Sequence, residues 1–405
     1  MQINTSKAWL IWIIGVSFLL FQFFLQLSSG IVIGTIMQER ALSAFTAGLL
    51  SSSFYYVYTS LQMPVGFLFD KYNARILLAS NAAICALGCF IFALINTLPS
   101  LFLGRIIMGT GSAFAFVGLA HIVRMQFPLR NYAFMIGLSE TLGFIVTVLG
   151  MIVLGWTISH CGWRGFIIVA GILGLLIAAL LWKFIPDTQT NRLESQNSIK
   201  YQNVLLILKN KLAWINGMFV CLEFSVITVF AALWAVPFLQ VKLDCSIKVS
   251  SLLASMLFLG TALSCPLFGQ LSILLSKRKR LMRLSCLLTA VLMILVLYLP
   301  THNHALIALL MFGIGLSCGA YMLTYTIANE LAPAQALSTC TGFTNTLAML
   351  SAPILQPLVG FLLDTSADTP GVYTLWDYQL VLLIIPALLL IAAFLVRYLP
   401  EKPAN

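Results

Sequence analysis

Long apolar runs separated by short polar breaks dominate the pattern of this chain. About twelve runs are long enough for an α-helix that crosses a bilayer, which needs roughly 20 residues. Apolar residues are continuous within a run rather than alternating, which excludes a transmembrane β-barrel. The pattern therefore predicts an all-α membrane protein with twelve transmembrane helices. The expected spans are residues 9–34, 44–69, 75–96, 99–124, 132–156, 163–185, 212–240, 249–275, 281–300, 303–329, 337–363 and 376–398.

The composition and the placement of charge support this class and set an orientation. Of the 405 residues, 60% are hydrophobic and 8% are charged, whereas soluble domains carry about 25% charged residues. A net charge of +10 would suggest nucleic acid in a soluble protein. Here seventeen of the 22 Lys and Arg residues fall in the expected inner loops and ends, and four in the outer loops. This bias accounts for the net charge without a nucleic-acid partner and predicts that both termini lie in the cytoplasm. The compact loops favour a bacterial inner membrane. The first apolar run is too long for a cleavable signal peptide.

A polar segment near the middle divides the chain into two similar parts. We expect six-helix bundles at residues 1–185 and 212–405, joined by a cytoplasmic linker at 186–211 whose apolar rhythm could form a short surface helix. Several residues recur at an offset near 205 positions, which favours a duplicated unit. The clearest set is Pro128, Gly137, Thr141 and Leu142, which recur as Pro333, Gly342, Thr346 and Leu347.

A short charged segment, Gly66 to Arg75, separates the second and third expected spans. Gly66 lets a neighbouring helix come close. Asp70 can lie against the N-terminal end of another helix, while Lys71 and Arg75 can face anionic lipid headgroups or pair with acids. This segment resembles the loop signature of the major facilitator superfamily, in which Gly is followed by Asp four residues later and then by bases. Asn73 stands where the family usually has Gly, and Asn tolerates the left-handed turn that Gly would supply. The alternative is an ordinary basic cytoplasmic loop.

Further segments extend the resemblance over nearly the whole chain. They are Arg105-Ile-Ile-Met-Gly-Thr-Gly, Gly162-Trp163-Arg164, and Gly360-Phe-Leu-Leu-Asp364, which echoes Gly66 to Asp70. The resemblance implies two pseudo-symmetric six-helix bundles with a substrate site between them near the middle of the membrane. The fifth span lacks the Gly-Pro-x-x-Gly-Gly run typical of drug/proton antiporters, which weakens an efflux function without excluding it.

Ionisable groups within the spans are functional candidates because a charge at this depth is costly. Glu140 and Glu223 lie near the middle third of their spans, where burial disfavours the charged form of a carboxyl. Such a group could take up and release a proton, and the alternative is a neutral Glu hydrogen-bonded between helices. Arg105 keeps its charge, so it could take part in proton coupling, pair with a carboxylate, bind an anionic substrate group or satisfy helix-end carbonyls.

Polar and aromatic side chains recur at helical spacing and could line a wet pocket. The alternative is hydrogen bonding between helices, or anchoring at the membrane interface for the aromatic residues. These candidate substrate-binding residues are Gln22, Gln26, Tyr55, Tyr58, Gln62, Trp234, Tyr321, Tyr325 and Asn345.

These features predict a secondary active transporter, most simply a proton-coupled symporter that takes up a small polar metabolite such as an amino acid, a sugar acid or another organic anion. Two alternatives stay open: proton-driven efflux of drugs or siderophores, and a receptor or assembly factor of similar fold that transports nothing. We expect no enzyme activity, cofactor or metal, because phosphate-loop, metal-ligand and nucleophile motifs are missing. We also expect the protein to be a monomer. The nine cysteines are scattered, and we expect small apolar residues rather than a Cys161–Cys245 disulfide.

Overall fold

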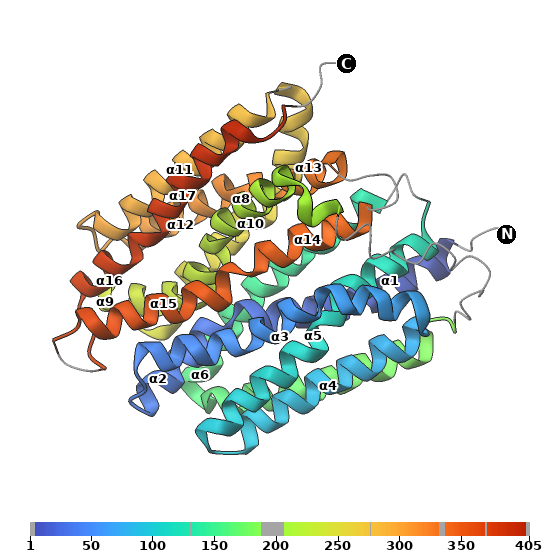
Figure 1. Ribbon diagram of the computed structural model, residues 1–405. Coiled ribbons are helices and arrows are strands. Elements are labelled where there is room, and N and C mark those ends of the chain that lie inside the picture. The colour runs from blue at the N-terminus through green and yellow to red at the C-terminus, as the bar shows by residue number, and fades with distance from the viewer. Residues whose placement is uncertain are drawn as a thin grey trace. The chain divides into compact units, whose positions relative to one another are not determined.

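The computed structural model describes residues 5–128, 132–187, 206–275, 277–331, 337–368 and 371–401. Its regular structure is helical (Figure 1), which confirms the all-α prediction. The first half contains α1 (Thr5–Leu27), α2 (Ser29–Glu39), α3 (Ala44–Lys71), α4 (Ala74–Leu94), α5 (Leu98–Gln126) and α6 (Tyr132–Phe184).

The second half alternates long helices with shorter distorted segments. Its elements are α8 (Lys211–Ser225), the π-helix η2 (Val226–Trp234), α9 (Ala235–Leu243), α10 (Ile247–Leu275), α11 (Arg278–Tyr298), α12 (His304–Ser317), the 3₁₀ turn η3 (Cys318–Met322), α13 (Leu323–Leu331), α14 (Leu337–Met349), α15 (Ser351–Ser366), α16 (Leu375–Leu382), α17 (Ile384–Leu395) and η5 (Val396–Tyr398). Most of the surface helix expected in the linker falls on residues 188–205, outside the described residues.

The helices match the expected spans closely. Within the described residues, eleven helices are long and apolar enough to cross a membrane, and α3, with 28 residues, covers the remaining expected span. Several expected spans contain a break or a distortion within the helix. The first span breaks at Ser28 between α1 and α2, and the seventh widens into the π-helix η2. The expected fifth and sixth spans form one element, α6, with a sharp change of direction at Gly162.

Gly162 supplies a backbone conformation that other residues rarely adopt. Its φ of 72° lies in the left-handed region, where a Cβ would be strained. The next residue, Trp163, is buried and packs edge-on against Phe92 of α4. Arg164 lies over the Trp163 ring and donates a hydrogen bond to Asn96. The Gly-Trp-Arg segment therefore fixes where the second part of α6 begins against the end of α4.

Polar caps define where other helices begin. Thr97 and Ser100 form a reciprocal capping box at the start of α5, and Thr374 and Asp377 form one at α16. Asn303 caps α12 by accepting hydrogen bonds from two backbone amides. These caps satisfy amides that have no partner within their own helix, so polar residues in an apolar chain mark the helix starts.

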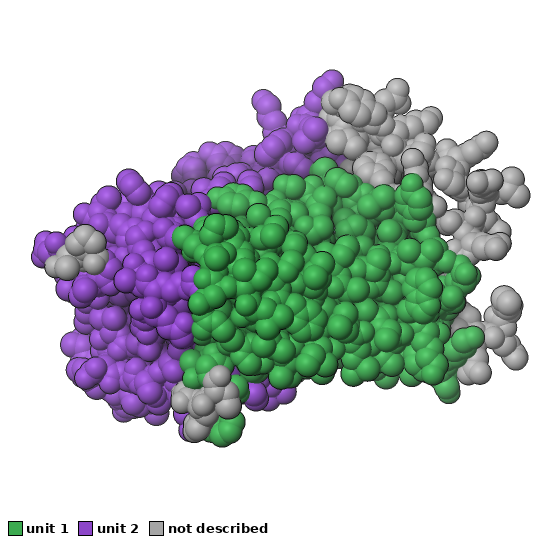
Figure 2. Space-filling model, turned by 90° about the horizontal axis from the view of Figure 1, so that it is seen from below, with its two compact units in different colours: residues 1–26, 53–147, 156–197 green, residues 27–52, 148–155, 198–405 purple. Residues whose placement is uncertain are grey.

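The chain divides into two compact units (Figure 2). The first contains residues 1–26, 53–147 and 156–197, and the second contains residues 27–52, 148–155 and 198–405. Both α3 and α6 contribute residues to each unit. The division into bundles at residues 1–185 and 212–405 stays a prediction.

In the first unit, glycines let α4 and α5 pack side by side (Figure 1). A Cβ at Gly111 would lie 2.3 Å from the carbonyl oxygen of Asn81, and one at Gly104 would lie 2.7 Å from Phe92. Gly109 makes a similar approach to the carbonyl of Phe54 on α3. The glycines that follow Arg105 in the sequence therefore allow the close approach of neighbouring helices.

In the second unit, an apolar core joins α8, α10, α11, η3, α13 and α17. Its fully buried members include Phe219, Met282 and Ile327. Asn216 of α8 donates to the carbonyl of Thr324, so the edge of this core also holds a buried side-chain contact. α11 and α17 run beside each other along it (Figure 1).

Candidate functional site

In the first unit, buried glutamines of α1 and tyrosines of α3 form a polar group. Gln22 and Gln26 are one turn apart and buried, and the Gln22 amide donates to the Gln26 side chain. Tyr55 is fully buried and has Gln26 and Arg105 as polar neighbours. Tyr58 is 2% exposed and stacks on Phe54, with 5.7 Å between ring centroids. The predicted stripes of α1 and α3 therefore lie inside the fold rather than toward lipid.

Glu140 of α6 completes this group. It lies near Tyr58, which also has Gln62 as a polar neighbour. Glu140 is half-buried, whereas Tyr58 and Gln62 are buried. The preceding residue, Ser139, accepts a hydrogen bond from the indole of Trp12 in α1. This tie holds α6 against α1, so the Glu140 carboxyl is held near the phenol of Tyr58. We call Gln22, Gln26, Tyr55, Tyr58, Gln62 and Glu140 the amide–phenol cluster.

Arg105 of α5 lies at the edge of this cluster and contacts the end of α1. Its Nη1 donates to the carbonyl of Leu25 at 3.0 Å, and its guanidinium lies 4.9 Å from the ring centre of Phe54. Leu25 is among the last four residues of α1, whose carbonyls no later amide of that helix satisfies. Of the alternatives raised by the sequence, the contact seen here is the one with helix-end carbonyls.

Glu223 has different surroundings, in the second unit. It is fully buried, and its Oε1 lies 2.9 Å from the hydroxyl of Ser285 on α11. Within the described residues its Oε2 has no hydrogen-bond partner. Ser285 also lies 2.5 Å from the carbonyl of Ser317, and the Ser317 hydroxyl contacts Thr289. This chain of hydroxyls suits a neutral, protonated carboxyl, because Glu223 can then donate to Ser285 while Ser285 donates to Ser317.

The remaining candidates of the second unit have different partners among the described residues. Tyr325 donates to Asn345 at 2.9 Å, so this pair links α13 to α14. The hydroxyl of Tyr321 instead contacts Cys265 of α10. Trp234 is buried at the end of η2, and its indole nitrogen has no hydrogen-bond partner within the described residues.

The charged segment after α3 differs in detail from its prediction. Asn73 has φ −62° and caps α4 by accepting a hydrogen bond from the amide of Arg75, so the expected left-handed turn is wrong. Arg75 donates to the carbonyl of Ile185 at 2.6 Å, just beyond α6. A Cβ at Gly66 would meet no described atom within 4 Å, so the expected close helix contact is not present here. The side chains of Asp70 and Lys71, like that of Cys161, lie outside the described residues.

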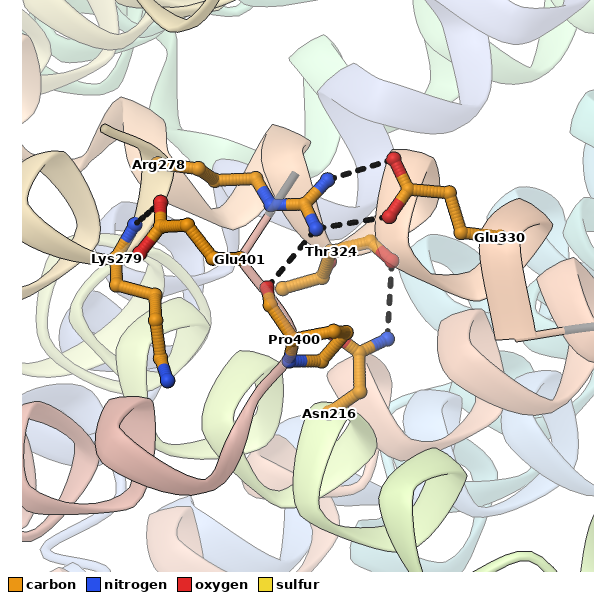
Figure 3. A network of polar contacts seen from close by, with 7 residues as sticks. All are labelled: Asn216, Arg278, Lys279, Thr324, Glu330, Pro400 and Glu401. Carbon is orange, nitrogen blue, oxygen red and sulfur yellow. Dashed lines mark hydrogen bonds and ion pairs between the residues drawn. The ribbon is translucent and has the colours of Figure 1, made fainter. Parts of the chain in front are cut away.

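Two polar groups of the second unit were not among the sequence candidates. Arg278 is 1% exposed, and both of its terminal nitrogens lie 2.8 Å from the carboxylate of Glu330 (Figure 3). The second group joins Asp364 and Tyr373 to the start of α3. For Asp364 a signal was present, since it ends the segment that echoes Gly66 to Asp70. Arg278 appeared only as one base in a basic loop.

Comparisons with known proteins agree with this architecture. The family model described as Major Facilitator Superfamily matches residues 12–357 and 224–405. A probable galactarate/D-glucarate transporter, GarP of Escherichia coli (strain K12), is 24% identical over 366 residues, which cover 81% of this chain and 82% of that one. A probable L-galactonate transporter of the same organism is 22% identical over 395 residues, covering 92% and 84%.

Solved structures show the same fold. A bacterial homologue of the human lysosomal transporter Spinster, described as inward-facing and unoccupied, has a TM-score of 0.77 at 16% identity and covers 98% of this chain and 99% of its own. The nucleoside transporter NupG has a TM-score of 0.73 at 16% identity, covering 97% and 98%.

Proposed function

The chain belongs to the Major Facilitator Superfamily, and on that premise we propose that it takes up a sugar acid or a similar hydroxylated organic anion together with protons. As a member of this family it is a multi-pass membrane transporter and not an enzyme. The substrate, the coupling ion, the direction of transport, the inner-membrane location and the cytoplasmic termini are parts of the proposal. Transport would proceed by alternating access, with the site opening to one side of the membrane at a time.

The observation that carries the proposal is the amide–phenol cluster with its half-buried carboxyl, Glu140. Amides and phenols can both donate and accept hydrogen bonds, which suits a ligand with several hydroxyl groups. Polar side chains are energetically costly within an apolar helix bundle. A group of them therefore indicates a role in binding or in helix packing. The sugar-acid transporters to which this chain is similar support the choice of a hydroxylated acid.

We assign proton coupling to Glu140 rather than to Glu223. A coupling acid must be able to reach water in at least one state and must respond to the substrate. Glu140 is half-buried and lies beside Tyr58 and Gln62. Glu223 is fully buried, and its carboxyl contacts the hydroxyl of Ser285. These surroundings favour a carboxyl that stays neutral and joins helices.

Arg105 acts as a positioning residue in this proposal. Its hydrogen bond to Leu25 and its contact with Phe54 hold the end of α1 against α3 and α5. Gln22 and Gln26 lie in the last two turns of α1, so their places depend on this end of the helix. Arg105 would thereby affect substrate binding without touching the substrate.

The test is uptake by the purified protein in liposomes with an alkaline interior. We expect labelled galactarate, D-glucarate or L-galactonate to accumulate above the outside concentration, and neutral galactose not to accumulate. A collapse of the pH gradient by a protonophore should abolish the accumulation. Accumulation of none of the acids would contradict the proposal, and outward movement of ethidium driven by the gradient would favour efflux instead.

A further inference from the structure

The first turn of α3 is held by residues far away in the sequence. The amide of Ala44 lies 2.9 Å from Oδ1 of Asp364, and the amide of Phe45 lies 2.9 Å from Oδ2. The hydroxyl of Tyr373 accepts from the Ala44 amide at 2.8 Å and donates to Asp364. Ser43, the local cap, accepts from the amide of Thr46. The first two amides of α3 thus have Asp364 of α15 as a partner.

This contact continues as a seam between α3 and α15, with matched steps of four residues. A Cβ at Gly360 would lie 2.2 Å from the carbonyl oxygen of Ala44, and one at Gly48 would lie 2.5 Å from that of Gln356. One turn further, the hydroxyl of Ser52 donates to the carbonyl of Ala352 at 3.2 Å. Small residues at these positions allow the two backbones to approach closely.

The seam also connects to the π-helix. The side-chain amide of Gln356 donates to the carbonyl of Thr228 in η2. Ser29 of α2 donates to the carbonyl of Ala232, four residues further along the same π-helix. The wide turns of a π-helix leave carbonyls that can accept such bonds. Elements of the first and second halves of the sequence therefore meet here through both backbone and side-chain contacts.

We propose that the Asp364 carboxylate is a latch that holds the outer side of the transporter closed. The two amides at the start of α3 carry the positive end of its helix dipole, and a carboxylate against them is stabilising. The loop charges place this end of α3 on the outer side of the membrane. In a transporter with alternating access, helices of the two halves must separate on that side before substrate enters. Opening then breaks the bonds of Asp364 to both amides, and closing forms them again.

The latch rests on the proposed transport cycle but not on its substrate or coupling ion. It makes Asp364 a positioning residue, which sets the balance between closed and open states without touching the substrate. Replacement by Asn keeps the shape and one acceptor oxygen but removes the charge, so the open state should become more populated. Tyr373→Phe should act in the same direction more weakly, because it removes the hydroxyl's bonds to Ala44 and Asp364 but leaves the carboxylate.

The experiment measures how fast a cysteine behind the gate reacts with a membrane-impermeant maleimide added outside liposomes. Ser29→Cys provides the probe, because Ser29 is buried against η2 and lies away from Asp364. If only the first turn of α3 unfolded, residue 29 would stay buried and would not react. In this background we expect Asp364→Asn to raise the labelling rate about 3- to 30-fold, the range expected for loss of a charged helix cap. Protein that keeps the native Ser29 gives the background from native cysteines.

Asp368→Asn is the matched control, since Asp368 is an exposed acid just beyond α15. It removes the same charge from the same end of the helix and should leave labelling unchanged. Equal labelling of the Ser29→Cys protein with and without Asp364→Asn would overturn the proposal. If Asp364→Asn fails to give folded protein, Tyr373→Phe decides, and unchanged labelling there would overturn it too. The labelling experiment needs no substrate. Its result can therefore be interpreted even if the uptake experiment fails.

Discussion

Arg75 and Arg278 make the same kind of contact in the two halves of the chain. Each stands in the first two residues of a helix, α4 or α11, and each donates to a carbonyl just beyond the last helical residues of its half. The acceptors are Ile185, at 2.6 Å from Arg75, and Pro400, at 3.0 Å from Arg278. The repeated contact supports the duplication that the sequence offset suggested.

Arg278 differs from Arg75 in its burial and in the closeness of its carboxylate partner, since Arg75 is partly exposed and lies 4.0 Å from the exposed Asp187. It is buried and bonded to Glu330 through two nitrogens, so Arg278→Met would leave the carboxylate and the Pro400 carbonyl without this partner. We expect a loss of about 1–3 kcal/mol in stability, seen as a lower melting temperature in detergent. The exposed neighbour Arg280 is the control, and Arg280→Met should melt like the parent. Equal melting of both variants would show that the Arg278–Glu330 ion pair contributes nothing measurable.

Gly111 tests the close packing of α4 and α5. A side chain there would meet the Asn81 carbonyl at 2.3 Å, so Gly111→Ala should cost about 1–3 kcal/mol through overpacking. A Cβ at Gly137 of α6 would meet nothing within 4 Å, and Gly137→Ala should be tolerated. Thermal melting and the fraction of monodisperse protein compare the two. A Gly111→Ala protein as stable as Gly137→Ala would mean that this helix contact relaxes freely.

Glu223 should tolerate an amide but not an apolar side chain. If its carboxyl is neutral, Glu223→Gln keeps a donor for Ser285 and should retain both its melting temperature and its uptake. Glu223→Leu leaves the hydroxyl of Ser285 with one partner fewer and should melt lower, by about 1–3 kcal/mol. Loss of gradient-driven uptake in a stable Glu223→Gln protein would instead assign coupling to this residue.

Tyr373 predicts how stability changes at high pH. Burial, and then the hydrogen bond to the Asp364 carboxylate, raise the pKa of this phenol above its ordinary value of 10.0. The folded protein keeps the phenolic proton where the unfolded chain releases it, so this stabilisation is complete below pH 10 and falls as the pH rises above it. Melting temperatures between pH 9 and 11 should fall less steeply for Tyr373→Phe than for the parent. Parallel slopes would mean that Tyr373 ionises freely in the folded state.

The sequence predicted the helices well because bilayer spans need long apolar runs, and such runs are visible without a structure. The sequence predicted the local backbone conformation less well where a hydrogen bond to a backbone group determines it. Asn73 caps a helix rather than forming a left-handed turn, because its side chain reaches the amide of Arg75. The π-helix of η2 leaves no signature in the apolar pattern, since its residues are as apolar as their neighbours. The break at Ser28 lies within Ser28, Ser29 and Gly30, too short a polar stretch to interrupt the long apolar run.

The candidate site was predictable in part. The rule that polar groups in a span face inward placed Gln22, Gln26 and Tyr55 correctly in the interior of the first unit. The same rule could not separate Glu140 from Glu223, because both lie at similar depth in their spans. Their difference comes from neighbours on other helices, Tyr58 for the first and Ser285 for the second, and these depend on packing.

The most direct test of proton coupling compares Glu140→Gln with Glu223→Gln in liposomes loaded with the transported acid. Exchange of labelled for unlabelled substrate needs binding and alternating access but no net proton movement. We predict that Glu140→Gln retains exchange while its accumulation under a pH gradient falls to that of protein-free liposomes, and that Glu223→Gln retains both. Full gradient-driven accumulation by Glu140→Gln would contradict the account.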